Sequence, residues 1–305
     1  MNNCKKTLSI VLSGTLLVLS WNLPVSSRPV DKGTEIELRG TVFSIYDTDF
    51  DDGGSIGMDH YEIAAGLDQQ VSEQLETGIG VSYTLQDYDF SGSSGFGGLN
   101  PWEEIHTVAV SASFTYSPDD KWSVLVSPFV ESSAESGADH SESYSYGGFV
   151  FASYAYSKDV ILGFGAGVSS GLEETTFIPT LYVRWQITEK LLLTNPSEAG
   201  PSGPAGLELS YAISPHWNIG AGAAYRSYRF RLDDDGVAPD GIGEFSGIPA
   251  WLRVSWQPTD FTTLALYGGY TFAGEIELED RDGRDISDDE YDPAPFAAVS
   301  LEITF

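Results

Sequence analysis

Short segments in which apolar and polar residues alternate recur along almost the whole chain. In one of them, FAAVSLEITF, the residues Ala297, Val299, Leu301, Ile303 and Phe305 are apolar, and those between them are small or polar. A period of two is the pattern of a β-strand with one apolar face. A helical period is nearly absent, and after the N-terminal segment no stretch approaches the 18 or so apolar residues of a membrane-spanning helix. The alternation therefore predicts an all-β fold.

The same pattern predicts about fourteen strands, most of them about ten residues or longer, which is enough to cross a bilayer on a tilt. They cover residues 34–46, 58–68, 74–88, 104–117, 121–131, 144–157, 159–169, 177–188, 190–195, 206–213, 216–231, 247–256, 260–275 and 296–305. The segment 190–195 is short, and twelve strands is the alternative if it and its partner do not span.

The connections between these strands alternate in length. The tight ones are DQQVSEQ, SPDDK, YSKD, TEK, SPH and QPTD, and long, mostly acidic connections lie between them. This alternation is what a single closed antiparallel transmembrane β-barrel requires, with short periplasmic turns and long external loops. A soluble secreted β-sandwich, the alternative, has no reason to sort its loops in this way.

Aromatic residues mark the same turns. Trp122, Trp185, Trp217 and Trp256 each lie beside a tight connection, and Phe305 ends the final strand. Indole rings prefer the headgroup layer of a membrane, and barrels carry aromatic girdles at their interfaces. We therefore expect these five residues at the membrane boundary. The apolar register of each strand should face lipid, and the small or polar register should face the lumen.

The N-terminal stretch MNNCKKTLSIVLSGTLLVLSWNLPVSS is typical of a cleaved secretory signal peptide over residues 1–27, which leaves 28–305 as the barrel. An uncleaved anchor helix is the alternative. Cleavage removes the single cysteine, Cys4, together with Lys5 and Lys6, so 13 of the 15 basic residues remain against 45 acidic ones. So acidic a chain is not expected to bind nucleic acid.

The stretch FAAVSLEITF resembles the C-terminal strand of Gram-negative outer-membrane barrels, which commonly ends in Phe and is recognised by the insertion machinery. Through PWEEIH, ESGAD, WQIT and GPSGPAGLELSY, the chain is also similar to a family of uncharacterised outer-membrane barrel proteins. The resemblance implies export to the bacterial outer membrane, with membrane lipid, lipopolysaccharide and the barrel-assembly machinery as partners. It supplies no activity.

Charged residues on the inward registers are the first candidates for a functional site. They are Glu37, Arg39, Glu62, Arg184, Glu208, Arg226, Arg253 and Glu302. We expect Arg184, Glu208, Arg226 and Arg253 on one wall, and Glu302 across the closing seam from Glu37 and Arg39. Such a set can form a constriction that sorts solutes, or interior ion pairs that hold the shape of the barrel. Other inward residues, such as Thr107, Ala109 and Ser111, are small and predict a narrow water-filled pore. The stretch 276–295 is the long loop best able to fold inward.

Acidic loops are the second candidates. Asp47, Asp49, Asp51 and Asp52 precede Gly53 and match the first half of a calcium loop. The match then fails, because position 52 is not glycine, position 58 is Met instead of Glu, and no helices flank the loop. A rim that attracts Ca²⁺ or Mg²⁺ loosely is the favoured interpretation, and no other cofactor is expected. Among the four histidines, only His60, together with Asp59, is a candidate for catalysis. We do not expect the protein to be an enzyme.

These patterns favour a passive, porin-like channel for small hydrophilic solutes with a preference for cations. The alternative is a structural or surface-interaction barrel with a blocked lumen, whose acidic loops contact cations or lipopolysaccharide. Fatty-acid uptake is disfavoured because we expect neither an N-terminal plug nor an apolar patch on the inward registers.

Overall fold

A computed structural model describes residues 33–92, 100–196, 201 and 205–305. The expected signal peptide lies outside these residues. The elements are β1 (Thr34–Asp49), β2 (Ser55–Gln70), β3 (Leu75–Ser91), β4 (Glu104–Tyr116), β5 (Trp122–Glu135), the 3-10 helix η1 (His140–Glu142), β6 (Tyr144–Ser157), β7 (Val160–Gly171), β8 (Glu174–Gln186), β9 (Leu191–Thr194), β10 (Gly206–Ser214), β11 (Trp217–Ala224), β12 (Arg226–Arg231), β13 (Ile242–Thr259), β14 (Thr262–Glu279), β15 (Asp285–Tyr291) and β16 (Ala294–Thr304). No helix in this part of the chain is long and apolar enough to cross a membrane.

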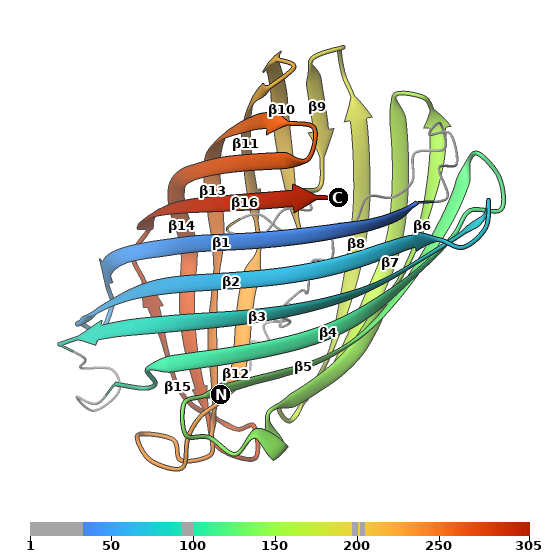
Figure 1. The fold of residues 1–305 in the computed structure, drawn as a ribbon. Coiled ribbons are helices and arrows are strands. Elements are labelled where there is room, and N and C mark those ends of the chain that lie inside the picture. Colours follow the sequence, from blue (N-terminus) through green and yellow to red (C-terminus); the bar gives the residue numbers. More distant parts are fainter. Residues whose placement is uncertain (1–32, 93–99, 197–200, 202–204) are drawn as a thin grey trace, which may run out of the picture.

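Fourteen of these strands form one closed antiparallel barrel, in the order β1 to β11, then β13, β14 and β16, which returns to β1 (Figure 1). The closing seam runs from Glu37 opposite Thr304 to Ile45 opposite Phe296. At its end, the N–H groups of Ile36 and Phe305 each donate to the other residue's carbonyl oxygen, at 3.1 and 2.8 Å. Closure pairs the backbone polar groups that hydrocarbon cannot hydrate. The predicted closed barrel of fourteen strands is confirmed.

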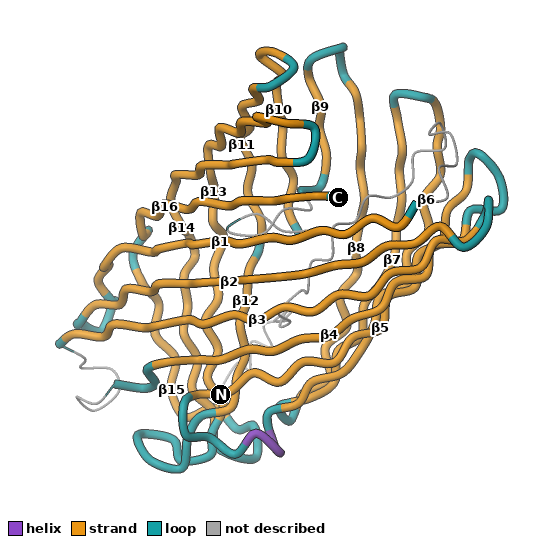
Figure 2. The backbone as a smooth tube through the Cα atoms, viewed as in Figure 1, coloured by secondary structure: helices purple, strands orange, loops and turns teal. Residues whose placement is uncertain are grey.

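The two kinds of connection lie at opposite ends of the barrel. The tight turns between β8 and β9 and between β10 and β11 lie at one end, and the loop that carries η1 lies at the other (Figures 1 and 2). We call the first the turn end and the second the loop end.

The apolar registers face outward. Side chains such as Leu181, Phe164 and Ile79 are 73 %, 65 % and 60 % exposed, although they are large and apolar. Trp122, Trp185, Trp217, Trp256 and Phe305 are also exposed, and Trp217 and Trp256 stack in register with ring centroids 5.9 Å apart. In a soluble sandwich these faces would pack together, so the outward apolar belt fits a barrel solvated by lipid.

Glycines on inward registers make room for large neighbours instead of leaving open space. A Cβ at Gly165 would lie 2.6 Å from the Phe151 ring, and one at Gly222 would lie 2.6 Å from the Trp251 ring. Gly243 accommodates Phe230 in the same way. At these glycines, large side chains on neighbouring strands fill the volume. The narrow water-filled pore predicted from the small inward residues stays a prediction.

The stretch 276–295 is not a long loop. β14 continues to Glu279, and β15 returns beside it from Asp285 to Tyr291. The lipid-facing side of β14 ends at Phe272, and beyond it Glu275 and Glu277 take the outward positions. Ala273, with φ of 49°, lies at this change of register, so the β14–β15 hairpin extends the sheet beyond the membrane-crossing part.

At the loop end the barrel narrows into a second, smaller ring. β12 hydrogen-bonds to β13, and Arg231 of β12 pairs in parallel with Ala134 at the end of β5. This pairing joins β5 directly to β12, so β6 to β11 are not part of the smaller ring. On the other side Phe50, just after β1, bridges Tyr291 of β15. The ring consists of β1, β2, β3, β4, β5, β12, β13, β14 and β15, and we call it the loop-end ring.

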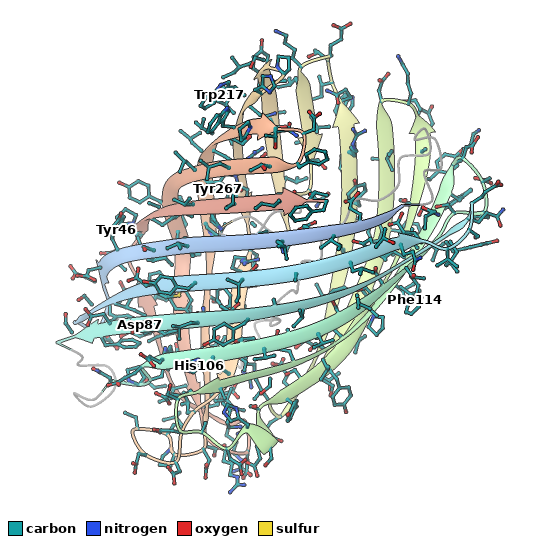
Figure 3. All side chains as sticks on the ribbon, in the orientation of Figure 1. Tyr46, Asp87, His106, Phe114, Trp217 and Tyr267 are labelled. Atoms are coloured by element: carbon teal, nitrogen blue, oxygen red, sulfur yellow. The ribbon has the colours of Figure 1, made fainter. Side chains whose placement is uncertain are left out.

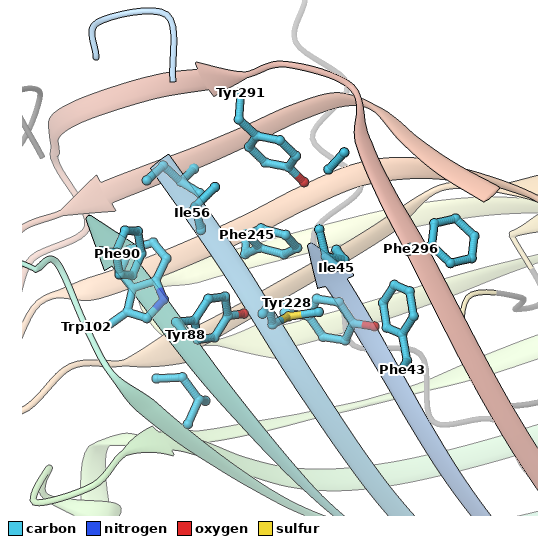
Figure 4. Close-up of a cluster of buried hydrophobic side chains, with 14 of the residues drawn as sticks. Phe43, Ile45, Ile56, Tyr88, Phe90, Trp102, Tyr228, Phe245, Tyr291 and Phe296 are labelled. Carbon is cyan, nitrogen blue, oxygen red and sulfur yellow. The ribbon is translucent and has the colours of Figure 1, made fainter. Parts of the chain in front are cut away.

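The interior of the loop-end ring is packed with apolar and aromatic side chains (Figure 4). Trp102 packs against Phe230 with ring centroids 5.1 Å apart, and Tyr88 packs against Phe245 at 5.5 Å. Other members include Phe43, Ile45, Ile56, Met58, Phe90, Tyr228, Ile276, Leu278, Tyr291 and Phe296. The inward registers thus carry a large apolar cluster that the sequence analysis did not expect.

Filling of the interior by side chains predicts that Gly165→Ala destabilises the barrel. The new methyl group would lie 2.4 Å from the Val150 carbonyl oxygen as well as against Phe151. Overpacking of this kind costs about 1–3 kcal/mol in free energy of unfolding, measurable by urea titration in lipid vesicles. Gly40→Ala is the matched control, because its Cβ would approach nothing closer than 4.0 Å. Equal stability of both variants would contradict this account of the interior.

The lumen and its closure at the loop end

Four of the predicted lumen residues gather beside the closing seam. Glu37 and Arg39 are buried, and Arg39 donates to Glu37 with a separation of 3.2 Å. The Arg39 Nε lies 3.7 Å from Glu62 on the next strand. Glu302 lies directly opposite Arg39 across the seam. These residues therefore form one charged group that links the first, second and last strands. The sequence predicted the position of Glu302 relative to Glu37 and Arg39, but not the contact with Glu62.

A second ion pair lies a few strands further along the wall, on the far side of β14. Arg253 of β13 donates through Nε and Nη2 to both carboxylate oxygens of Glu208 on β10, at 3.1 and 2.5 Å. The indole N–H of Trp251 also donates to Glu208, at 2.9 Å. Gly220, on the strand between them, allows this approach, because a Cβ there would lie 2.7 Å from the carboxylate.

The other two predicted residues do not join this pair. Arg226 donates to the Tyr228 hydroxyl at 3.3 Å and lies over that ring, 5.6 Å from its centroid. Arg184 is half-buried and makes no ion pair with a described residue. Of the four residues expected on one wall, Glu208 and Arg253 therefore pair with each other, and Arg184 and Arg226 lie outside this pair.

Two arginines that the sequence analysis did not single out hold β12 in place. Arg229 binds Glu244 on β13 at 3.3 Å and pairs closely with Glu279 on β14, so it stabilises the sheet from within. It also reaches the loop between β7 and β8, where it donates to the Leu172 carbonyl oxygen at 3.1 Å.

Arg231, like Arg229, makes contacts that cross from the ring to the rest of the barrel. It is 2 % exposed, and it donates to Glu173 of the β7–β8 connection and to the Glu142 carbonyl oxygen of η1, both at 3.2 Å. Glu135, at the end of β5, accepts from the backbone N–H of Asp233 at 3.1 Å. We call the contacts of Arg231 and Glu135 the latch.

The sequence does contain a signal for β12. If β11 continued straight on through residue 231, Arg229 and Arg231 would occupy the same outward register as Trp217 and Ile219. An arginine facing lipid costs about 2–4 kcal/mol at the bilayer midplane. The alternation Tyr228-Arg229-Phe230-Arg231 therefore indicates that the strand has left the membrane wall.

A row of acidic residues crosses the hairpins at the loop end. Glu244, Glu277 and Asp288 lie side by side on β13, β14 and β15, and Arg229 lies at the end of the row beside Glu244. Partial burial and the neighbouring carboxylates of Glu244, Glu275, Glu279 and Asp285 raise the pKa of Glu277 to about 7. This carboxyl group therefore titrates near neutral pH.

The predicted cation loop does not gather its carboxylates. Asp47, Asp49, Asp51 and Asp52 are all exposed. Within the described residues, no three His, Cys, Asp or Glu side chains are placed to hold a metal ion. Loose attraction of Ca²⁺ or Mg²⁺ by the rim stays a prediction. Asp59 and His60 point to opposite faces of β2, with Asp59 exposed and His60 buried, so the arrangement they were expected to offer does not form.

The closed ring, the outward apolar belt and the sorted connections together define a β-barrel of the bacterial outer-membrane type. Residues 93–304 match a family model described as a domain of unknown function, DUF6268. The chain therefore belongs to this uncharacterised family of outer-membrane β-barrel proteins. No curated protein matches the sequence.

Solved structures that the chain resembles include outer-membrane channels. The COG4313 outer membrane channel from Pseudomonas putida F1 is 9 % identical with a TM-score of 0.50, and the match covers 91 % of this chain and 99 % of that one. The P. putida toluene transporter TodX is 10 % identical with a TM-score of 0.43 and 92 % coverage of both chains. The NanC porin is 11 % identical with a TM-score of 0.35, covering 88 % and 99 %. At these identities the likeness concerns the fold alone.

The buried ion pair predicts a specific loss of stability. Arg253→Met leaves the Glu208 carboxylate buried without its cation, which costs about 3 kcal/mol in free energy of unfolding. Arg184→Met removes the same charge from a half-buried site without an ion pair, so we expect a loss of about 0.5 kcal/mol or less. Urea titration of both variants in vesicles compares them, and the double variant Glu208→Leu/Arg253→Met should recover most of the loss. A similar loss at both sites would contradict the importance of the pair.

Proposed function

We propose that the protein is an outer-membrane channel for small hydrophilic solutes, closed at the loop end by the hairpin of β12 and β13. The observation that carries the proposal is the unequal strength of the strand pairings in the loop-end ring. β2 and β3 pair without interruption from Ser55 to Gln70, whereas β12 meets β5 through the single pair Arg231 and Ala134. This joint and the bridge between Phe50 and Tyr291 are the two places where the ring is closed by a single residue pair, and the hairpin would have to move at the first of them.

Opening at this joint leaves the membrane-crossing wall intact, because β11 and β13 stay paired below it. The cost is exposure of Tyr228 and Phe230, which are buried in the closed ring. Each fully buried aromatic side chain contributes roughly 1.5–3 kcal/mol, so the closed form dominates and openings are brief.

A preference for cations follows from the charge at the entrance. The β14–β15 hairpin carries acidic residues at the loop end: Glu275, Glu277, Asp285, Asp288 and Glu290. Four more acidic residues are exposed at the end of β1 and directly after it: Asp47, Asp49, Asp51 and Asp52. Acidic rings at a pore entrance raise the local concentration of cations and repel anions. Residence in the outer membrane, after removal of residues 1–27, belongs to the same proposal.

The second candidate function is a barrel that stays blocked and whose acidic loops contact cations or lipopolysaccharide. The aromatic packing inside the loop-end ring favours this alternative, because it places side chains across the lumen (Figure 4). The two candidates differ in one measurable property, which is conductance.

A reversible cross-link tests the movement of the hairpin. Cysteines introduced by Ala134→Cys and Arg231→Cys occupy paired positions, so oxidation should join β12 to β5. In planar bilayers we expect no openings from the oxidised barrel and frequent openings after reduction, because the reduced form also lacks the latch arginine. Conductance that is the same in both states would show that solutes do not pass this joint.

The latch itself gives a second prediction. Arg231→Gln removes charge-assisted hydrogen bonds worth about 2 kcal/mol, which corresponds to an increase of about 30-fold in the ratio of open to closed channels. The matched control is Arg284→Gln, which removes an exposed arginine bound only within its own loop, to Asp280 and Asp282. No openings from either variant would favour the blocked barrel, and a clear preference for anions would reject the proposed selectivity.

Opening should also depend on pH through Glu277. In the closed ring its pKa lies above the ordinary value of 4.5, in part because Glu244 of the hairpin lies beside it. Movement of Glu244 away from Glu277 would lower this pKa in the open form, so the closed ring is favoured at low pH and loses stability as the pH rises through about 7. We therefore expect several-fold more openings at pH 8 than at pH 5.5, measured in symmetrical salt solutions. Glu277→Gln should flatten this dependence, and an unchanged dependence in the variant would assign it to another group.

A further inference from the structure

A serine, a histidine and a tyrosine meet on the outer wall, away from the lumen. His106, on the outward register of β4, has its Nε2 2.9 Å from the Ser136 hydroxyl and its Nδ1 2.8 Å from the Tyr83 hydroxyl. Ser136 directly follows β5, and Tyr83 lies on the outward register of β3. The Tyr83 and His106 rings also stack, with centroids 6.1 Å apart.

This arrangement has the parts of an activated nucleophile. When Nδ1 carries the ring proton and donates it to the tyrosine oxygen, Nε2 is free to accept the serine proton. Tyr83 then fixes the tautomer and orientation of the base. Glu104 lies beside both groups, with its carboxylate 3.4 Å from the Ser136 hydroxyl and 3.9 Å from Nε2, where it would stabilise the charged imidazolium.

The position of His106 along β4 indicates its depth relative to the membrane. Figure 3 labels His106 and Phe114 on β4, and the outward residues Val108, Val110, Phe114 and Tyr116 continue from His106 toward the turn end. Ten residues separate His106 from Tyr116. At about 3.4 Å per residue and a tilt of about 40°, they span about 26 Å, close to the height of the apolar band of a barrel. If Tyr116 lies at one interface, His106 lies at the other, on the side of the loops.

We propose that Ser136 and His106, positioned by Tyr83, form a catalytic site that hydrolyses acyl esters of lipids in the outer leaflet. The ester bonds of membrane lipids lie where the acyl chains meet the headgroups, which is the level at which Tyr83 and Ser136 are exposed and His106 is half-buried. The substrate reaches the site by lateral diffusion along the wall, so this activity is independent of the lumen and of the proposed channel.

The reaction uses no further reagent except water. The Ser136 oxygen attacks the carbonyl carbon while its proton passes to Nε2 of His106, and the ester C–O bond then breaks as the leaving alcohol takes that proton. Water attacks the resulting acyl-serine and gives a proton to Nε2. The serine oxygen leaves, regains that proton, and a carboxylic acid is released.

A fluorophosphonate probe, which labels activated serines, tests the site on the full barrel refolded in detergent. We expect labelling of the native protein and none of Ser136→Ala. Ser141→Ala, in the same loop, is the matched control and should label normally, because Ser141 contacts Asp139 and not the histidine. His106→Asn should slow labelling by about 10²–10⁴-fold, the usual contribution of a general base.

Tyr83→Phe separates positioning from folding. Loss of the hydroxyl should slow labelling by about tenfold and change its pH profile, because the imidazole loses the acceptor of its Nδ1 proton. Heat-modifiable migration in gels confirms that each variant is folded. A folded native barrel that does not label, or equal labelling of Ser136→Ala, would overturn the proposal.

The lipid source is distinguished by two substrates. Native barrel and Ser136→Ala are each mixed with vesicles of phosphatidylethanolamine or with purified lipopolysaccharide, and released fatty acid is measured by mass spectrometry. Serine-dependent release from either substrate supports an esterase and identifies its source. Absence of release from both rejects a lipid ester as the substrate, and release that persists in Ser136→Ala rejects Ser136 as the nucleophile.

Discussion

The requirement that every backbone N–H and C=O inside hydrocarbon find a partner within the protein governs this fold. Water is absent there, so an open sheet edge would leave a row of unpaired groups, each costing several kcal/mol. The chain meets the requirement by pairing β16 with β1, down to the two hydrogen bonds between Ile36 and Phe305. Closure then divides every strand into one face for lipid and one for the interior, and the alternating sequence follows from that division.

Beyond the hydrocarbon the requirement weakens, and the strands pair differently. Loop-end backbone groups can bind water, so β12 can leave the wall and meet β5 through a single residue pair. This departure converts a wide barrel into a narrower ring whose interior can be filled by side chains. The apolar cluster around Trp102 and Phe245 is thus made from the same inward registers that carry charge nearer the turn end. Arg229 and Arg231 lie on the polar outer face of β12, where they form ion pairs with Glu279 and Glu173.

The features that the sequence predicts well are those set by local alternation. Strand number, the lipid-facing registers, the closing seam and the exposed Trp residues near the turns all follow from period two and connection length. The apolar cluster could not be obtained in the same way, because inward Phe43 and Ile45 alternate with outward residues just as inward threonines do elsewhere on β1. What decides their environment is the pairing of β12 with β5, which are separated by about ninety residues and leave no local trace except the arginines at 229 and 231. The filling of the volume beside Gly165 could not be predicted for a related reason, because a glycine in the sequence gives no information on the size of Phe151 on the neighbouring strand.

β5 connects the two surfaces of the protein. Ala134 pairs with β12, Glu135 accepts from both Glu103 and Asp233, and Ser136 follows at once with its backbone N–H on the Glu104 carbonyl oxygen. The end of this strand therefore holds the closing hairpin on the inside and the serine on the outside. In the proposed opening, the bond from Asp233 to Glu135 would break and the bond from Glu103 would remain, so the β4–β5 hydrogen bonds that place Ser136 beside His106 would not depend on the hairpin. Successive side chains of a strand point to opposite faces, so Glu135 faces the interior and Ser136, the next residue, faces outward.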